Sequence, residues 1–270
     1  MQPLLYGKVI VIIGGTTGLG LSAANACLGA GARGVVIVGR SDESLSTALA
    51  ALGGRVDGFA ADAADPVVGE RAVQMAHDKF GRFDCLYHVA GGSGRRMGDG
   101  PLHELTNEGI DATLQMNLGS VMYSNRAAVQ AWRRARCSGA ILNMGSVLGF
   151  RPSPKYFATA AYAATKAGIV GFSRSIASYY ASGNIRVNVL APGLVETPMA
   201  RRAAGDKKIQ AFVATKQPLD GGRIGVPSDC DGAAVFLLSD AARFITGQVL
   251  SVDGGWSVSE GQYNGTRALV

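Results

Sequence analysis

Short apolar runs alternate along the chain with longer stretches of helical periodicity. The runs are rich in Val and Ile, as is typical of strands covered on both faces of a sheet. They occupy residues 9–13, 35–38, 56–61, 85–89, 140–144, 187–190 and 249–252. Helices are expected up to about residue 28 and at 66–80, 106–136, 162–180 and 228–238. This alternation predicts an α/β fold, in which a doubly wound, seven-stranded parallel sheet lies between two layers of helices.

A glycine-rich turn directly follows the first apolar run. Its glycines have the spacing G-x-x-x-G-x-G, and an Ala/Leu-rich helical stretch comes next. Strand, glycine turn, helix and strand form the context of a phosphate-binding turn, because glycine lets the backbone approach a pyrophosphate and the amides opening the helix attract its charge. We therefore predict a Rossmann-type dinucleotide site. Its first contacts would be Gly14, Thr16, Thr17, Gly18, Leu19 and Gly20.

The ends of the second and third strands indicate which dinucleotide binds. NAD-binding units often carry an acidic residue after the second strand, whereas this chain has Gly39 and then Arg40. A guanidinium suits a 2′-phosphate, so NADP(H) is favoured and NAD(H) is the alternative. Asp62, followed by Ala63, could bond the adenine amino group. The simpler alternatives are a surface arginine and an ordinary loop aspartate.

Composition and charge exclude several classes of function. Of the 270 residues, 47% are hydrophobic and no linker or repeat interrupts the alternation, so one domain spanning 1–270 is expected. The net charge is +6, but the basic clusters are short and lack interleaved aromatic residues, which argues against nucleic acid. Neither a membrane span nor a signal peptide is evident, so a cytoplasmic location is expected. The four cysteines and three histidines show no metal-ligand spacing.

Tyr162 and Lys166 stand four residues apart in a predicted helix, so their side chains share one face. A phenol beside an ammonium group is a tunable proton donor, because a neighbouring cation favours the phenolate. The spacing recurs by chance in many helices. Its meaning therefore depends on the rest of the chain.

Further motifs extend the pattern over nearly the whole sequence. In chain order they are Gly14, Gly18 and Gly20, His88-Val89-Ala90-Gly91, Asn117, Ser146, Tyr162 with Lys166, Pro192-Gly193 with Thr197, and Asp253-Gly254-Gly255. From Gly7 to about Trp256 the chain therefore resembles the short-chain dehydrogenase/reductase family of the classical type. Each motif alone is weak, but their order and their placement on the expected elements make the resemblance specific.

The resemblance implies interconversion of a carbonyl and a secondary alcohol by hydride transfer with a nicotinamide cofactor. In reduction, Tyr162 would donate a proton to the carbonyl oxygen, to which Ser146 would also hydrogen-bond. Lys166 would bind the nicotinamide ribose and lower the pKa of Tyr162. Asn117 would hold a water that resupplies protons. Further implied cofactor contacts are Ala90, Gly91, Pro192, Gly193, Val195 and Thr197, besides Tyr162 and Lys166.

Structural roles are the alternatives at several of these positions. Ser146 could serve only in a turn, Asn117 could bridge backbone groups within a helix, and Thr197 could cap the helix that contains Pro198. The chain also departs from the family, because His88 stands in place of an asparagine. We expect His88 to be a structural donor and not a catalytic residue.

Three segments should face the substrate, namely 92–101, 150–161 and 194–223. The prolines of 150–161 predict a stiff loop, and 194–223 is long and polar enough to form a lid. Arginines and lysines are frequent in all three. They suit an anionic partner such as the phosphorylated carrier of a 3-oxoacyl thioester, although a solvated helix face is the simpler interpretation. An apolar ketone, a sugar or a steroid are the alternative substrates.

The resemblance also implies a homotetramer, with a homodimer as the alternative, built through the helix at 106–136, the catalytic helix and the last strand. The tail 257–270 could reach a neighbouring subunit. A second class of function is a non-catalytic dinucleotide sensor on the same fold. A sensor would be expected to have lost catalytic residues, whereas Asn117, Ser146, Tyr162 and Lys166 are all present.

Overall fold

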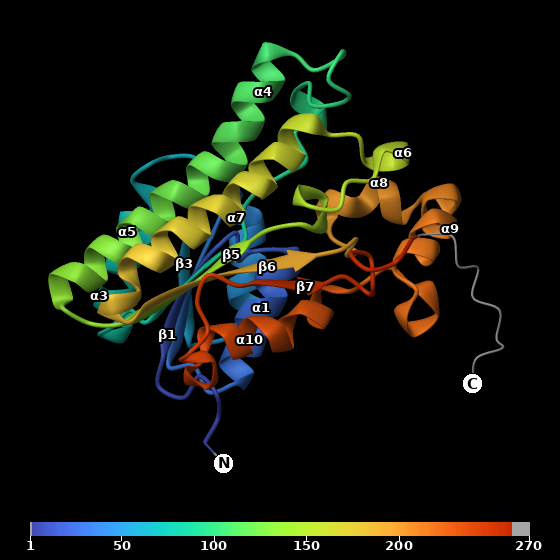
Figure 1. Cartoon of the computed structure of the whole chain (residues 1–270). Helices are drawn as coiled ribbons and strands as arrows, with labels where there is room; N and C mark the ends of the chain where they lie inside the picture. The colour runs from blue at the N-terminus through green and yellow to red at the C-terminus, as the bar shows by residue number, and fades with distance from the viewer. Residues whose placement is uncertain (1, 261–270) are drawn as a thin grey trace.

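Seven parallel strands form one sheet in the computed structural model, which describes residues 2–260 (Figure 1). The spatial order is β3-β2-β1-β4-β5-β6-β7, as in a doubly wound fold. The strands are β1 Val9–Ile13, β2 Gly34–Gly39, β3 Val56–Ala60, β4 Cys85–His88, β5 Gly139–Met144, β6 Ile185–Pro192 and β7 Val249–Val252. All seven predicted strands are confirmed, and β1 and β7 have the predicted bounds.

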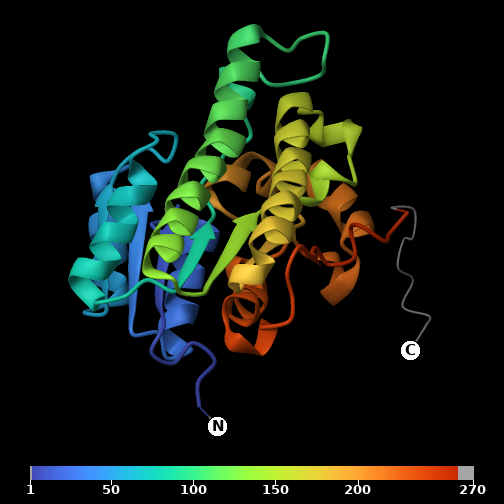
Figure 2. The same cartoon turned by 60° about the vertical axis from the view of Figure 1, so that its left-hand side comes forward.

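Helices cover both faces of the sheet (Figures 1 and 2). The longer ones are α1 Gly18–Gly29, α2 Asp42–Leu52, α3 Val68–Phe80, α4 Asn107–Leu114, α5 Ser120–Ala135, α7 Ala160–Tyr180, α9 Lys207–Lys216 and α10 Asp231–Leu238. α3, α5 and α7 pack on one face, and α1, α2 and α10 pack on the other. Since side chains alternate along a strand, β1 supplies both cores, with Ile10 and Ile12 on one side and Val9, Val11 and Ile13 on the other.

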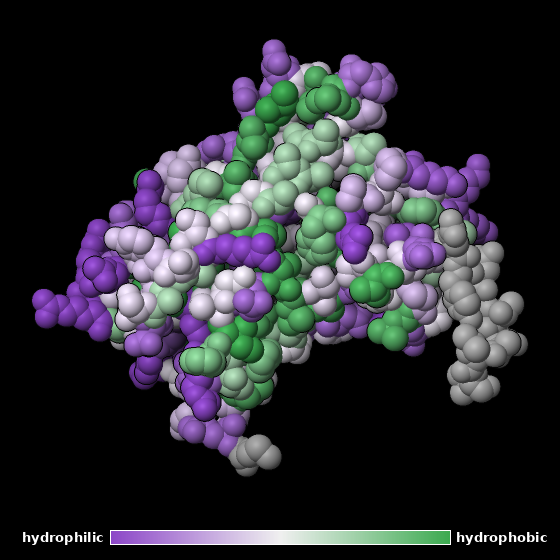
Figure 3. Space-filling model, viewed as in Figure 1, coloured by the Kyte–Doolittle hydropathy of each residue, from purple (hydrophilic) through white to green (hydrophobic). Residues whose placement is uncertain are grey.

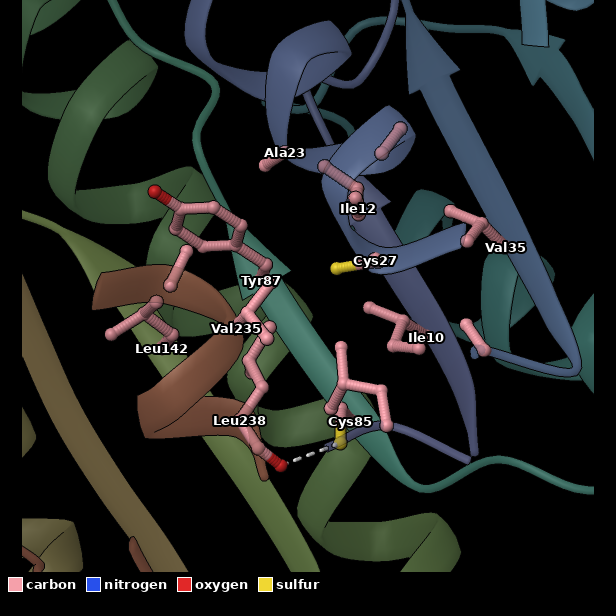
Figure 4. Close-up of a cluster of buried hydrophobic side chains, with 14 of the residues drawn as sticks. Ile10, Ile12, Ala23, Cys27, Val35, Cys85, Tyr87, Leu142, Val235 and Leu238 are labelled. Carbon is pink, nitrogen blue, oxygen red and sulfur yellow. Dashed lines mark hydrogen bonds between the residues drawn. The ribbon is translucent and has the colours of Figure 1, made fainter. Parts of the chain in front are cut away.

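The core under α1 and α10 contains three of the cysteines, Cys27, Cys85 and Cys230, of which Figure 4 labels the first two. Cys27 and Cys85 are fully buried and free, as the apolar sequence around them predicts. Burial raises the pKa of Cys85 to about 12 and raises that of Cys27 further, so both thiols stay protonated. The Cys85 thiol donates to the carbonyl oxygen of Leu238, 3.4 Å away. These cysteines therefore serve as small apolar groups.

The helix predicted over 106–136 is interrupted. Between α4 and α5 the backbone forms a π-helical segment, Gln115–Gly119, which places Asn117 on a widened turn. The Asn117 amide donates to the carbonyl of Thr113 at 3.0 Å, and the Ser120 hydroxyl donates to that of Met116 at 2.7 Å. Single π turns of this kind occur mainly at functional sites, and hydrophobic periodicity does not reveal them.

Two segments beyond the carboxyl ends of the strands are more ordered than the sequence indicates. The stretch at 150–161, expected to be a stiff loop, contains the short helix α6, Pro154–Phe157, which begins at Pro154 because proline suits a first helical position. The expected lid at 194–223 contains α8, Arg201–Ala204, and α9. A small apolar cluster around Trp256 joins both segments.

Within the described residues, no helix has the length and hydrophobicity that a membrane crossing requires. Residues 2–260 also hold no group of three or more His, Cys, Asp or Glu side chains arranged around a metal position. Of the tail at 257–270, the part from residue 261 onward lies outside the described chain.

Candidate active site

The four predicted catalytic residues come together beyond the ends of β4 and β5. Ser146 follows β5, and the turn after it contacts α7 at Gly149, where a Cβ atom would lie 2.8 Å from the backbone of Lys166 and Ala167. This contact places the Ser146 hydroxyl near enough to Tyr162 to act on the pKa of the phenol. The Lys166 ammonium donates to the carbonyl of Met144 at 2.9 Å and lies 5.5 Å from the centre of the Tyr162 ring.

Burial controls the charges of this pair. It raises the pKa of Tyr162, and the hydrogen bond to Ser146 opposes part of that rise. Burial also lowers the pKa of Lys166 to about 8. The expectation that Lys166 lowers the pKa of Tyr162 is therefore not met in the protein alone: burial is the largest cause of the shift, and Ser146, not Lys166, is the group that opposes it. At neutral pH the phenol holds its proton and can act as an acid.

Asn117 is fully engaged with the backbone. Its side-chain oxygen accepts from the amide of Gly92 at 3.1 Å, and its nitrogen donates to the carbonyl of Gly92 at 3.0 Å as well as to Thr113. The structural role considered from the sequence is thus present. It fixes the loop after β4 next to Gly91, where a Cβ atom would lie 3.6 Å from the Lys166 nitrogen.

His88 is a structural residue, as predicted. It is fully buried on β4, with its ring nitrogens 2.7 Å from the Ser124 hydroxyl and 3.2 Å from the Ser120 hydroxyl. Burial lowers the pKa of His88 to about 3, and the charge of Lys166 adds to the effect. The neutral ring therefore links β4 to the start of α5, directly after the π segment that carries Asn117.

Asp99 is the main residue of the site that the sequence did not reveal. The carboxylate is buried, and its two oxygens accept from the backbone amides of Ala161 at 3.0 Å and Tyr162 at 2.9 Å. Thr159, at the N-cap of α7, provides no side-chain cap, so Asp99 caps the catalytic helix from another part of the chain. The only local signal was an aspartate between two glycines.

The glycine turn after β1 has the geometry of a dinucleotide cradle. Gly14 has φ +90°, and a Cβ atom there would lie 2.6 Å from the amide nitrogen of Ala90. Gly18 has φ +53°, a conformation that favours glycine. The N-cap of α1, Thr17, makes no side-chain hydrogen bond, which leaves the first amides of the helix available to a phosphate. The residues present therefore fit a dinucleotide.

The end of β2 favours NADP(H). A side chain at Gly39 would collide with Thr16, so no carboxylate can stand there. Arg40 is exposed, and none of the hydrogen bonds or ion pairs found within 2–260 uses its guanidinium. Asp62 is exposed, and its side chain accepts from the amide of Ala64 at 2.9 Å, as in an ordinary loop aspartate. Ala63, between Asp62 and Ala64 in the chain, is half-buried.

The turn after β6 lies across from the glycine turn. Thr197 accepts from the amide of Ala200 at 3.3 Å, which is the capping role that the sequence left open. A Cβ atom at Gly18 would lie 3.3 Å from the Thr197 side chain, so Thr197 also faces the cradle.

Pro192 and Val195, in the same turn, are buried, and the amide of Gly193 donates to the carbonyl of Val252 at 3.1 Å. A pocket of about 470 Å³ is lined by Glu196, Thr197, Pro198, Arg201, Ala204 and Gly205.

Gln217 is a second residue that the sequence did not reveal. Its side-chain oxygen accepts from the amide of Leu194, and its nitrogen donates to the Leu194 carbonyl at 3.2 Å. Gln217 is buried, so this two-way pairing is shielded from water. It joins the two ends of the segment 195–216 directly beside Gly193.

The fold and the site together define a Rossmann-type oxidoreductase that uses a nicotinamide dinucleotide. Comparisons with known proteins agree. A family model described as enoyl-(acyl carrier protein) reductase matches residues 14–257. The 3-oxoacyl-[acyl-carrier-protein] reductase of Chlamydia trachomatis is 35% identical over 258 residues, covering 94% of this chain and 99% of that protein. The 2-(S)-hydroxypropyl-CoM dehydrogenase 3 of Xanthobacter autotrophicus is 35% identical over 263 residues, covering 94% and 98%.

Solved structures are similar over the same length. A short-chain type dehydrogenase/reductase from Mycobacterium ulcerans has a TM-score of 0.86 at 29% identity, covering 94% of this chain and 91% of that chain. Levodione reductase has a TM-score of 0.84 at 29% identity, covering 93% and 98%. The chain belongs to the short-chain dehydrogenase/reductase family. It is an NAD(P)(H)-dependent oxidoreductase that interconverts a carbonyl and an alcohol.

Proposed function

We propose that this chain reduces the carbonyl of a small molecule with NADPH, with Tyr162 as the proton donor. The observation that carries the proposal is the placement of Tyr162 between two groups: the Ser146 hydroxyl acts on the phenol, and the Lys166 ammonium nitrogen lies 5.5 Å from the centre of its ring. When bound, the nicotinamide supplies the hydride. Tyr162 then donates its proton to the carbonyl oxygen, and Ser146 hydrogen-bonds that oxygen as negative charge develops. In the reverse direction Tyr162 would act as the base.

Lys166 and Asn117 would help to return a proton to Tyr162 after it has reacted. An ammonium group with a pKa of about 8 can pass a proton inward and regain one near neutral pH. Because both oxygen and nitrogen of the Asn117 side chain bond the backbone, its contribution would come through the widened π turn, which can hold a water next to Lys166. Lys166 would also bind the nicotinamide ribose.

The cofactor would lie along the cradle described above, with its 2′-phosphate at Arg40. Gly14, Thr16, Thr17, Gly18, Leu19 and Gly20 would contact the phosphates, Asp62 and Ala63 the adenine, and Ala90, Gly91, Pro192, Gly193, Val195 and Thr197 the nicotinamide half. The similarity to a 3-oxoacyl-[acyl-carrier-protein] reductase and to a 2-(S)-hydroxypropyl-CoM dehydrogenase supports a 3-oxoacyl thioester or a related ketone as substrate, with a sugar as the alternative.

Removal of the phenolic oxygen of Tyr162 tests whether this residue is the proton donor. Tyr162→Phe should abolish turnover of the carbonyl substrate while NADPH binding, followed by fluorescence titration, stays within about twofold. Tyr179→Phe is the matched control, since Tyr179 is an exposed tyrosine on the same helix. A dinucleotide sensor would show no turnover in the unmodified protein. Turnover that survives in Tyr162→Phe would show that another group supplies the proton.

For assembly and location, we propose one catalytic domain over 1–270, closed by a lid at 194–223, that forms a cytoplasmic homotetramer. Apolar side chains are exposed on α4, α5, α7 and β7, among them Leu114, Met122, Tyr179 and Leu250. Figure 3 shows apolar surface over α4 and along the β7 side. Light scattering after gel filtration would distinguish a tetramer from a dimer, and a monomer at micromolar concentration would contradict the proposal.

A further inference from the structure

Two guanidinium groups converge on one backbone atom beside the active site. Arg95 and Arg202 each donate to the carbonyl oxygen of Tyr156, at 3.1 Å and 3.3 Å. A third cation is close, since the Lys155 nitrogen lies 5.4 Å from the centre of the Tyr156 ring. Like charges repel at such short range, so an anion bound between the two guanidinium groups would be stabilised.

Within residues 2–260, no carboxylate is paired with these cations: no ion pair there includes Arg95, Lys155 or Arg202. Asp99 is the acid that acts on Arg95, but both of its oxygens are occupied by the amides of α7. Burial lowers the pKa of Arg95, the charge of Arg202 adds to that effect, and the charge of Asp99 opposes it. Each guanidinium has five N–H donors and uses one here, so most donors remain available.

The position of this pair links it to the substrate. Arg95 precedes Asp99 in the loop that follows β4, and Tyr156 lies on α6, just ahead of Tyr162 in the chain. Arg202 comes from α8 in the lid segment, next to α6 (Figure 1). The three segments that are expected to face the substrate therefore meet at the Tyr156 carbonyl. Tyr156 and Phe212 provide apolar surface beside it, with ring centres 5.2 Å apart.

We propose that Arg95 and Arg202 form a subsite for an oxyanion at the far end of the carbonyl substrate, such as a carboxylate or a phosphate. This proposal rests on the proposed function and names its substrate class. The oxyanion would take up the free guanidinium donors and neutralise the pair. Because Arg202 belongs to the lid segment and Arg95 to the body of the domain, an anion bound between them would also hold the lid against the site.

Two pairs of probes separate the charge of the substrate from its reacting group. Acetoacetyl-coenzyme A is compared with the uncharged acetoacetyl-N-acetylcysteamine, and 5-oxohexanoate with its methyl ester. In the unmodified enzyme, kcat/KM should be higher for the charged member of at least one pair. A preference in the first pair alone assigns a phosphate, and a preference in the second alone assigns a carboxylate. Equal values within both pairs would overturn the subsite.

Variants then locate the effect. Arg95→Gln and Arg202→Gln should each lower kcat/KM for the charged probe about tenfold or more, and for its uncharged partner less than about twofold. Arg96→Gln and Lys207→Gln remove the same charge from neighbouring exposed positions and should change neither value. Equal losses on charged and uncharged probes would show that the two arginines only fix α6. Losses as large in the two control variants would show a diffuse basic surface, as an acidic carrier protein would use.

A binding measurement keeps the subsite distinguishable from the reaction. The dissociation constants of the same probes are measured by calorimetry with the enzyme saturated with NADP⁺. Charge-selective binding that depends on Arg95 and Arg202 without any turnover would uphold the subsite and refute the proposed reaction. Turnover of the uncharged probes without charge-selective binding would uphold the proposed reaction and refute the subsite.

Discussion

Asp99 offers the sharpest test of how the catalytic helix is held. Its two oxygens each accept one amide, those of Ala161 and Tyr162. Asp99→Asn keeps one acceptor oxygen and turns an NH₂ group toward the other amide. The second amide then has no acceptor in a buried place, and the negative charge at the helix N-terminus is lost.

The cost follows from these contacts. A buried amide without an acceptor costs about 1–3 kcal/mol. Loss of the charge at the helix terminus adds about 0.3–1 kcal/mol. We therefore expect the free energy of unfolding to fall by about 2–3 kcal/mol, which for a domain of this size lowers Tm by about 4–10 °C. Because one of the two amides belongs to Tyr162 itself, kcat should fall by roughly tenfold or more.

Asp206→Asn provides the matched control. Asp206 caps α9, but a single oxygen, Oδ1, accepts from both Lys208 and Ile209. Asparagine retains that oxygen and is an equally good N-cap, so Tm and kcat should stay close to those of the unmodified enzyme. Calorimetry and steady-state assays on both variants measure the difference. If Asp99→Asn behaves like Asp206→Asn, Asp99 does not position the helix and the reasoning fails.

Three further predictions concern the cofactor and the titrating groups. Arg40→Ala should weaken NADPH binding about tenfold or more and leave NADH binding nearly unchanged, by fluorescence titration; equal losses would contradict a 2′-phosphate contact. The pKa of His88 is about 3 when folded and 6.5 as its ordinary value, so the unfolded chain binds the extra proton between these values and stability is lost as the pH falls through that window. His88→Asn should therefore flatten the decline in urea unfolding free energy between pH 7 and pH 4.5, and an unchanged slope would exclude His88 as its cause. With the pKa of Lys166 at about 8, the reduction rate should fall as the pH rises through 8, and Lys166→Arg should shift the midpoint of this fall to higher pH. The same pH profile in the unmodified enzyme and in Lys166→Arg would show that Lys166 does not supply the proton.

The strands and the main helices were predictable because their signal is local. Runs such as Val9–Ile13 are β-branched and bounded by glycine, so hydrophobic periodicity alone places them. Helix α2 was missed, although Ser41 caps it and its Leu45, Ala48, Leu49 and Leu52 recur at helical spacing. Gly34 was left out of β2, since a glycine has no hydrophobic signal; it is required because any side chain there would collide with Phe80.

The remaining features of the site depend on contacts between distant segments. Asp99 meets Tyr162 across 63 positions, and Gln217 meets Leu194 across 23, and no spacing rule connects such pairs. The π turn at Asn117 arises from side-chain bonds to the backbone that a helical pattern does not encode. The direction of the Tyr162 pKa was wrong for a similar reason, because burial is a property of the whole fold and the sequence showed only the neighbouring charge.

The pairing of Gln217 with Leu194 gives the segment 195–216 two fixed ends that are joined to each other. We expect the part of the segment that holds α8 and α9 to open locally with little movement of β6. Its opening free energy is then separate from that of global unfolding, as in other locally opening units. Hydrogen exchange should detect this as amides of α9 that exchange by a local route while those of β6 exchange only on global unfolding. Sequence changes within 195–216 can thus alter which substrates the enzyme accepts at little expense to the stability of the fold.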